Sequence, residues 1–118
     1  MENKRSEKGK IIVLKVDFER IKPFSKQTSS TYFVGSLKSR DVEKVFGEAE
    51  WINEEMPNEI AIKFKNGIIA TIYNRDKYKR LDWSVGGHNR ISYIMVALAL
   101  GEINKKQGII TLVESGIK

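Results

Sequence analysis

Runs of apolar residues, spaced either two or three to four positions apart, divide this chain into strands and helices. Residues 11–18 place apolar side chains at every second position and predict a first strand, which a polar loop over 22–30 follows. Residues 31–34 predict a short extended piece that ends at Gly35. The alternating pattern recurs at 109–113 and predicts a last strand.

Two segments have the spacing of helices. The first, 40–46, begins after Ser39 as its N-cap and ends at Gly47, and its expected apolar face consists of Val42, Val45 and Phe46. The second, about 90–103, is apolar nearly all round and must be buried on more than one side. In so small a chain, that burial leads us to expect a homo-oligomer with this helix at its interface.

A hairpin is the strongest local prediction. Asn66-Gly67 indicates a two-residue turn in which both residues have positive φ. That turn places Lys63 opposite Ala70, and it predicts a core face made of Ile60, Ile62, Phe64, Ile69 and Tyr73. The second strand is then apolar on its other face too, which needs a cover from a helix, a neighbouring subunit or a ligand pocket.

The sequence also predicts a strand over 82–85, with Trp83 and Val85 on one face. The expected fold class is α+β, an antiparallel sheet of about four to five strands with two helices packed on it. Residues 1–10 predict a flexible basic N-terminal tail, and 11–118 a single α+β domain.

Composition narrows the chemistry. The chain has 118 residues, of which 41% are hydrophobic and 31% charged, as in globular proteins. The absence of Cys excludes disulfides, thiolate nucleophiles and sulfur-ligated metals. The apolar run after the charged first ten residues is too short for a signal sequence or a membrane span, so we expect a cytoplasmic protein with no membrane partner.

The net charge of +6 favours anionic partners. One basic cluster, 75–80, includes Arg75 and lies beside Tyr73 and Trp83. These aromatic rings could stack a base while the basic side chains screen its phosphates. The alternative is that Tyr73 and Trp83 are core aromatics with one polar edge exposed.

The best candidate site is a glycine-rich turn before the second helix. Backbone N–H groups at a helix start suit a phosphate, and this turn consists of Gly86, Gly87, His88, Asn89 and Arg90. The alternative is a tight turn with Asn89 as a plain N-cap. A second small-residue turn could hold another anionic group or serve as a capping loop, and it consists of Gly35, Ser36, Leu37, Lys38 and Ser39.

The sequence gives no support for a catalytic site. His88 is the only histidine, there is no HxH or HExxH spacing, and neither a P-loop nor a Rossmann fingerprint is present. The sequence contains no nucleophile-elbow motif that would support a Ser-His-Asp triad. We therefore expect a binding protein and not an enzyme, with no metal and no cofactor.

Several motifs together resemble a family of small phage-encoded proteins. The family pattern is G-T-S-L-Q-G, then L-x-x-x-F-G-E-P, then E-W-x-I-x-F-x-D-G-T-x-A-T-I-Y-D-W-K, and last W-x-I-G-G. This chain matches it best in VFGE at 45–48, in NG followed by ATIY at 66–73, and in WSVGG at 83–87. With the helix that follows, the resemblance covers under two-thirds of the chain. It departs from the pattern at 35–37 and 74–76 and in the extra C-terminal strand, so the ligand can differ from that of relatives.

The family is similar to phage proteins that sequester the nucleotide immune signals of anti-phage cyclase or TIR-domain systems. The resemblance implies a non-catalytic pocket for a small anionic (cyclic) nucleotide, acting in the host cell cytoplasm. Both glycine turns would hold the ligand, and Tyr73 and Trp83 would stack its base. The alternatives are a protein-binding inhibitor of a host defence enzyme and, less favoured, a nucleic-acid-binding module that uses residues 4–10 and 75–80.

Overall fold

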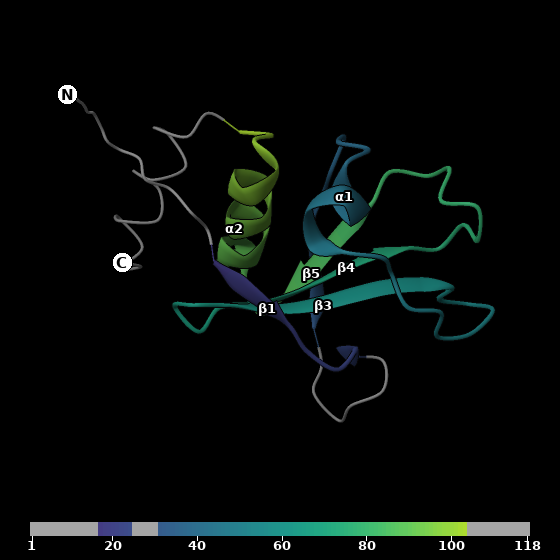
Figure 1. Ribbon diagram of the computed structural model, residues 1–118, viewed down its shortest axis with the longest axis horizontal. Coiled ribbons are helices and arrows are strands. Elements are labelled where there is room, and N and C mark those ends of the chain that lie inside the picture. Colours follow the sequence, from purple (N-terminus) through teal and green to yellow (C-terminus); the bar gives the residue numbers. More distant parts are fainter. Residues whose placement is uncertain (1–16, 25–30, 104–118) are drawn as a thin grey trace.

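The computed structural model describes residues 17–24 and 31–103, in which an antiparallel sheet carries two helices on one of its faces (Figure 1). The strands lie in the order β1-β3-β4-β5-β2. Their bounds are β1 Phe18–Arg20, β2 Tyr32–Ser36, β3 Asn58–Phe64, β4 Ile69–Asn74 and β5 Ser84–Gly87. The helices are α1 Val42–Phe46 and α2 Arg90–Leu100. This arrangement confirms the predicted α+β class with a sheet of about five strands.

Some sequence predictions fall outside the described residues. They are the basic tail at 1–10, most of the first strand at 11–18, residues 25–30 of the loop at 22–30, and the last strand at 109–113. Within the described residues, β1 begins at Phe18 and pairs antiparallel with β3.

The predicted two-residue hairpin turn is wrong by one residue. The loop has three residues, 65–67, because the Phe64 N–H donates to the Ile68 carbonyl oxygen at 2.8 Å and the Gly67 N–H donates to the Phe64 oxygen at 2.8 Å. Gly67 has a φ of +92°, whereas Asn66 is not among the residues with positive φ. A three-residue loop with a positive-φ glycine in its last position is a common way to join two antiparallel strands.

The shift in register exchanges the faces of β4. Lys63 lies opposite Ile69 instead of Ala70, and Ile60 lies opposite Ile72. Because side chains alternate along a strand, a slip of one residue moves each of them to the other face. Ala70 and Ile72 are therefore buried in the core. Tyr73, Thr71 and Ile69 lie on the opposite face, which we call the pocket face of the sheet.

Helix α1 is shorter than predicted. It begins at Val42, and the Ser39 hydroxyl accepts a hydrogen bond from the Asp41 N–H at 3.1 Å instead of capping the helix. Val42 and Phe46 are buried, but Val45 is exposed, so the predicted apolar face loses one member. Gly47, at a φ of +95°, ends the helix as the sequence predicts.

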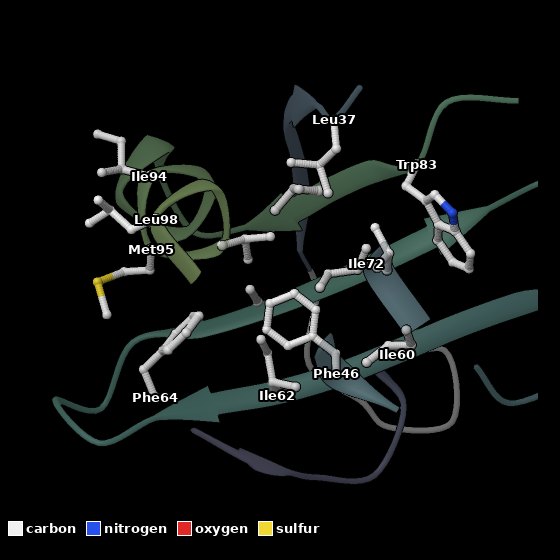
Figure 2. Close-up of a cluster of buried hydrophobic side chains, with 14 of the residues drawn as sticks. Leu37, Phe46, Ile60, Ile62, Phe64, Ile72, Trp83, Ile94, Met95 and Leu98 are labelled. Atoms are coloured by element: carbon white, nitrogen blue, oxygen red, sulfur yellow. The ribbon is translucent and has the colours of Figure 1, made fainter. Parts of the chain in front are cut away.

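The core lies between the helices and the sheet, where Phe46 of α1 and Phe64 of β3 pack near residues of α2 (Figure 2). Helix α2 ends at Leu100, earlier than the predicted residue 103. Its C-cap residue, Gly101, has a left-handed φ of +70°. Most apolar side chains of the helix are buried, among them Ile94, Met95, Val96 and Leu98, whereas Tyr93, Ala99 and Leu100 are half-buried. The homo-oligomer expected at this helix stays a prediction.

Candidate functional site

The glycine turn before α2 has a buried part and an exposed part. Gly86 and Gly87 are the last residues of β5 and are buried. A Cβ on Gly87 would clash with the Ser92 side chain, so this glycine allows α2 to pack closely on β5. The Asn89 side chain accepts a hydrogen bond from the Ile91 N–H at 2.8 Å and caps the helix. Of the five residues in the turn, His88, Asn89 and Arg90 are exposed.

The second turn binds an anion that the chain itself supplies. The Lys38 N–H donates to Glu102 Oε2 at 2.6 Å, and the Ser39 N–H donates to Oε1 of the same carboxylate at 3.3 Å. Leu37 is fully buried, and its N–H donates to the Trp83 carbonyl oxygen at 2.8 Å. The backbone donors expected from the sequence are present, but Glu102 occupies them.

The two turns lie at opposite ends of one strand pair. In the antiparallel pairing of β2 with β5, Tyr32 lies opposite Gly87 and Ser36 lies opposite Ser84. Residues 36–39 therefore follow one end of the pair, and residues 88–90 follow the other.

The two aromatic residues expected to stack a base have different environments. Trp83 is only 3% exposed and belongs to the hydrophobic core, which supports the core alternative for this residue. Tyr73 is partly exposed on the pocket face, and the Arg75 guanidinium lies 5.4 Å from the centroid of its ring. Tyr73 and Arg75 remain together as a candidate site, whereas Trp83 does not join them.

A pocket of about 270 Å³ opens beside Tyr73 on the pocket face. Three predicted site residues line it, namely Tyr73, Arg75 and Gly86. The other lining residues were not predicted from the sequence; they are Phe24, Thr31, Tyr32, Phe33, Met56, Glu59 and Thr71. The alternation of Thr71, Tyr73 and Arg75 along one face could have indicated the pocket, but the wrong hairpin register assigned Tyr73 to the core.

A buried carboxylate forms the floor of the pocket. Glu59 is 1% exposed, and its Oε2 accepts hydrogen bonds from the Phe24 N–H at 2.7 Å and from the Thr71 hydroxyl at 3.0 Å. Burial of a carboxylate is costly unless hydrogen bonds compensate it, and these two contacts contribute that compensation. The bond from the Phe24 N–H also holds this residue against β3, and the Phe24 ring forms part of the pocket wall.

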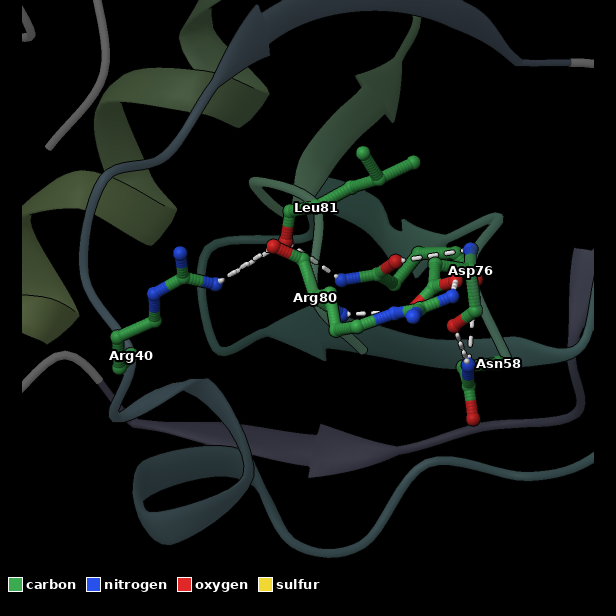
Figure 3. A network of polar contacts seen from close by, with 6 residues as sticks. Arg40, Asn58, Asp76, Arg80 and Leu81 are labelled. Carbon is green, nitrogen blue, oxygen red and sulfur yellow. Dashed lines mark hydrogen bonds and ion pairs between the residues drawn. The ribbon is translucent and has the colours of Figure 1, made fainter. Parts of the chain in front are cut away.

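The rim of the pocket belongs to a loop that is held in place by a polar network (Figure 3). The Asn58 side chain donates to the carbonyl oxygens of Asn74 and Asp76, at 3.3 and 3.0 Å, and Asn74 Nδ2 donates to the Leu81 oxygen at 2.9 Å. Arg80 Nη2 and Nε donate to the Asp76 carboxylate at 2.7 and 2.9 Å. These bonds from Arg80 lower the pKa of Asp76 to about 2.

A second contact fixes the same loop to α1. The Lys79 ammonium lies 2.9 Å from the Glu43 carboxylate, and Lys79 has a left-handed φ of 62°. Tyr78 is exposed, with Lys77 and Arg80 over its ring at 5.3 and 5.1 Å. The basic loop predicted from the sequence is therefore an ordered surface that presents cations and a phenol ring.

Across residues 17–24 and 31–103, no group of three or more His, Cys, Asp or Glu side chains gathers where a metal ion could bind. Nor does any helix in that part of the chain have the length and apolar character to span a membrane. Comparison of the chain with protein-family models, curated proteins and solved structures found no match.

Proposed function

We propose that this chain is a non-catalytic binding protein that captures a small anionic nucleotide signal in the pocket beside Tyr73. In the role implied by the phage resemblance, it acts in the host cell cytoplasm and lowers the concentration of a defence signal. Such a protein works by mass action, so it needs affinity for the signal and does not need turnover.

One observation carries this proposal: Arg75 and Tyr73 both line the pocket, and the Arg75 guanidinium lies 5.4 Å from the centroid of the Tyr73 ring. Arg75 Nη1 also donates to the Glu55 carbonyl oxygen at 3.3 Å, which holds the guanidinium in place. An aromatic face stacks on the planar ring of a base, and a guanidinium forms paired hydrogen bonds with a phosphate. The two groups thus offer the two kinds of contact that a nucleotide requires. The remaining wall adds apolar surface from Phe24, Phe33 and Met56.

The burial of Glu59 at the floor of the pocket favours a binding role for the pocket over a catalytic one. Glu59 is the acidic residue among those that line the pocket, and its Oε2 is engaged by Phe24 and Thr71. A general base must reach the proton that it removes, whereas this carboxylate is 1% exposed and holds the chain together. Its role in the proposal is to support the wall of the pocket.

A thermal-shift screen of the full chain tests the proposal, with cyclic dinucleotides, cyclic trinucleotides and isomers of cyclic ADP-ribose as probes. We expect at least one to raise the midpoint of unfolding, because a ligand that binds only the folded state stabilises it. Ligand recovered after denaturation should be chemically unchanged. If no probe stabilises the chain at saturating concentration, or if the recovered ligand is hydrolysed, the proposal is wrong.

A matched pair of variants ties binding to this pocket. Arg75→Gln removes a cation that lines the pocket, while Lys77→Gln removes an equal charge from the same loop outside the pocket. We expect Arg75→Gln alone to abolish the thermal shift. Equal losses in both variants would indicate general electrostatic attraction instead.

The second candidate is a protein-binding inhibitor of a host defence enzyme. The observation that favours it is a pair of exposed aromatic side chains on edge strand β2, Tyr32 at 68% and Phe33 at 60%. Exposed aromatic residues are frequent in the energetically dominant parts of protein interfaces. Capture of a host enzyme by the chain, lost in a Tyr32→Ser and Phe33→Ser double variant but kept in Arg75→Gln, would favour this candidate over the first.

A further inference from the structure

Two loops lie side by side at the end of the sheet where β3 begins and β4 ends (Figure 1). The loop at 47–57 leads from α1 to β3, and the loop at 75–83 leads from β4 to β5. A hydrogen bond of 3.3 Å joins them, because the Arg75 guanidinium donates to the Glu55 carbonyl oxygen. Both of these residues are exposed, so the two loops form one continuous surface.

The two loops differ in the sign of their charge. Residues 47–57, the acidic loop, include four Glu and no Lys or Arg. Residues 75–83, the basic loop, include four Lys or Arg and two Asp. Among the described residues, the exposed side chains of Glu54, Glu55 and Lys77 form no ion pair, so their charges are open to a partner. Each loop can therefore attract a loop of the other sign.

Each loop also exposes large apolar side chains. Trp51 of the acidic loop is more than half exposed, as are Tyr78 and Leu81 of the basic loop. Aromatic side chains that become buried on association supply much of the binding free energy of protein interfaces. Charged groups around them contribute mainly to the choice of partner and to the rate of association. The surface offers both kinds of contact.

Both loops are held in one conformation by contacts within the chain. In the acidic loop, Asn53 Oδ1 accepts hydrogen bonds from the N–H groups of Glu55 and Met56, at 2.9 and 2.8 Å. In the basic loop, Lys79 keeps a φ of 62°, which is unfavourable for a residue other than glycine, and its ammonium pairs with Glu43. A surface that is already ordered loses little conformational entropy on association.

We infer that these two loops form a docking surface for a second copy of this chain, a role independent of nucleotide binding. A twofold axis between two copies places the acidic loop of each copy on the basic loop of the other, so the same contact occurs twice. A partner with a single sign of charge would meet repulsion from one of the two loops. A second copy carries both signs on one surface and avoids this repulsion. The surface differs from helix α2, at which the sequence predicts a homo-oligomer.

Sedimentation velocity of the full chain over a series of concentrations, at low and at high NaCl, tests this inference. We expect a dimer whose proportion rises with concentration and falls as salt screens the charges of the two loops. Tyr78→Ser should raise the dissociation constant of this dimer roughly tenfold or more, because it removes an apolar side chain from the interface. Tyr78 is exposed, so its replacement leaves the core intact. A chain that stays monomeric under all these conditions would overturn the inference.

Two charge reversals provide a sharper test. Glu54→Lys and Lys77→Glu should each weaken self-association roughly tenfold or more, because the reversed charge repels the facing loop of an identical copy. An equimolar mixture of the two variants should form a dimer with one chain of each kind, since both contacts then join opposite charges. Native mass spectrometry of the mixture identifies that dimer. Lys65→Glu makes the same charge change at the exposed hairpin loop and should leave the dissociation constant nearly unaltered.

The remaining outcomes locate the interface. If Lys65→Glu weakens the dimer as much as Lys77→Glu does, net charge and not this surface controls association, and the inference is wrong. If the mixed variants form no dimer, the twofold pairing of the acidic loop with the basic loop is wrong. Loss of the dimer in Tyr32→Ser and Phe33→Ser, with Tyr78→Ser unaffected, would place the interface at β2 and would also overturn the inference.

Discussion

The carboxylate of Glu102, just beyond the C-terminal end of α2, accepts a hydrogen bond of 2.6 Å from the backbone N–H of Lys38. A second bond joins it to the Ser39 N–H. These residues are far apart in sequence, and their contact ties the end of the helix to the loop that leads from β2 to α1. A turn that the sequence predicts to hold a ligand thus forms a structural contact within the chain.

Replacement of Glu102 tests that structural role. Glu102→Gln keeps the size of the side chain but removes the charge that strengthens its hydrogen bonds to Lys38 and Ser39. We expect the free energy of unfolding to fall by roughly 1 kcal/mol, measured by urea denaturation. Glu54→Gln, at an exposed position, is the control and should have almost no effect. Equal stability of the two variants would contradict the assigned contact.

The hairpin loop allows a clean test of register. Gly67→Ala places a side chain at a φ of +92°, with no atom within 4 Å of the new Cβ. The cost is therefore backbone strain alone, and we expect a loss of about 1 kcal/mol of stability. Asn66→Ala should cost less, since it removes only the 3.2 Å hydrogen bond from the Ile68 N–H to Asn66 Oδ1. If both substitutions cost the same and Asn66→Gly is stabilising, the two-residue turn with both φ values positive would be correct after all.

Acid should loosen the loop that carries Arg75. Hydrogen bonds from Arg80 hold the pKa of Asp76 at about 2, below its ordinary value of 3.8. Because the pKa is lower in the folded state, the pair stabilises the fold fully above pH 3.8 and loses that effect as the pH falls towards 2. In Asp76→Asn this contribution to the pH dependence should vanish.

Unfolding midpoints of the wild type and of Asp76→Asn, measured at intervals from pH 6 to pH 2, check this expectation. The difference between the two proteins should shrink as the pH falls. High salt should shrink it as well, because Arg80 is exposed to solvent. A difference that stays constant over the whole range would show that Asp76 acts only through its shape.

Local rules predicted the elements of this fold better than their pairing. Gly47 and Asn89 act at helix ends as their residue types suggest, because capping depends on neighbouring residues alone. The hairpin register failed because Lys65-Asn66-Gly67 is compatible with a two-residue or a three-residue loop, and only the packing of the whole strand decides between them. One residue of slip moved Tyr73 from the expected core to the pocket face.

The candidate site was harder to predict than the fold. Its walls come from segments distant in sequence, with Phe24 before β2, Phe33 within it and Met56 before β3. No spacing in the sequence connects these residues, because a sheet brings them together through its strand order. Trp83 illustrates the converse error, since its place beside a basic loop in the sequence suggested a binding role while packing buries it in the core.

The central claim is that a nucleotide binds in the pocket beside Tyr73 and Arg75 and not at residues 38–39 or 88–90. The most direct measurement is an amide NMR titration of the full chain with the nucleotide that gives the largest thermal shift. The account predicts that the perturbed amides cluster at Thr71 to Arg75, at Phe33 and at Gly86, which border the pocket. Perturbations confined to residues 88–90 and 38–39, with the amides of Thr71 to Arg75 unmoved, would contradict it.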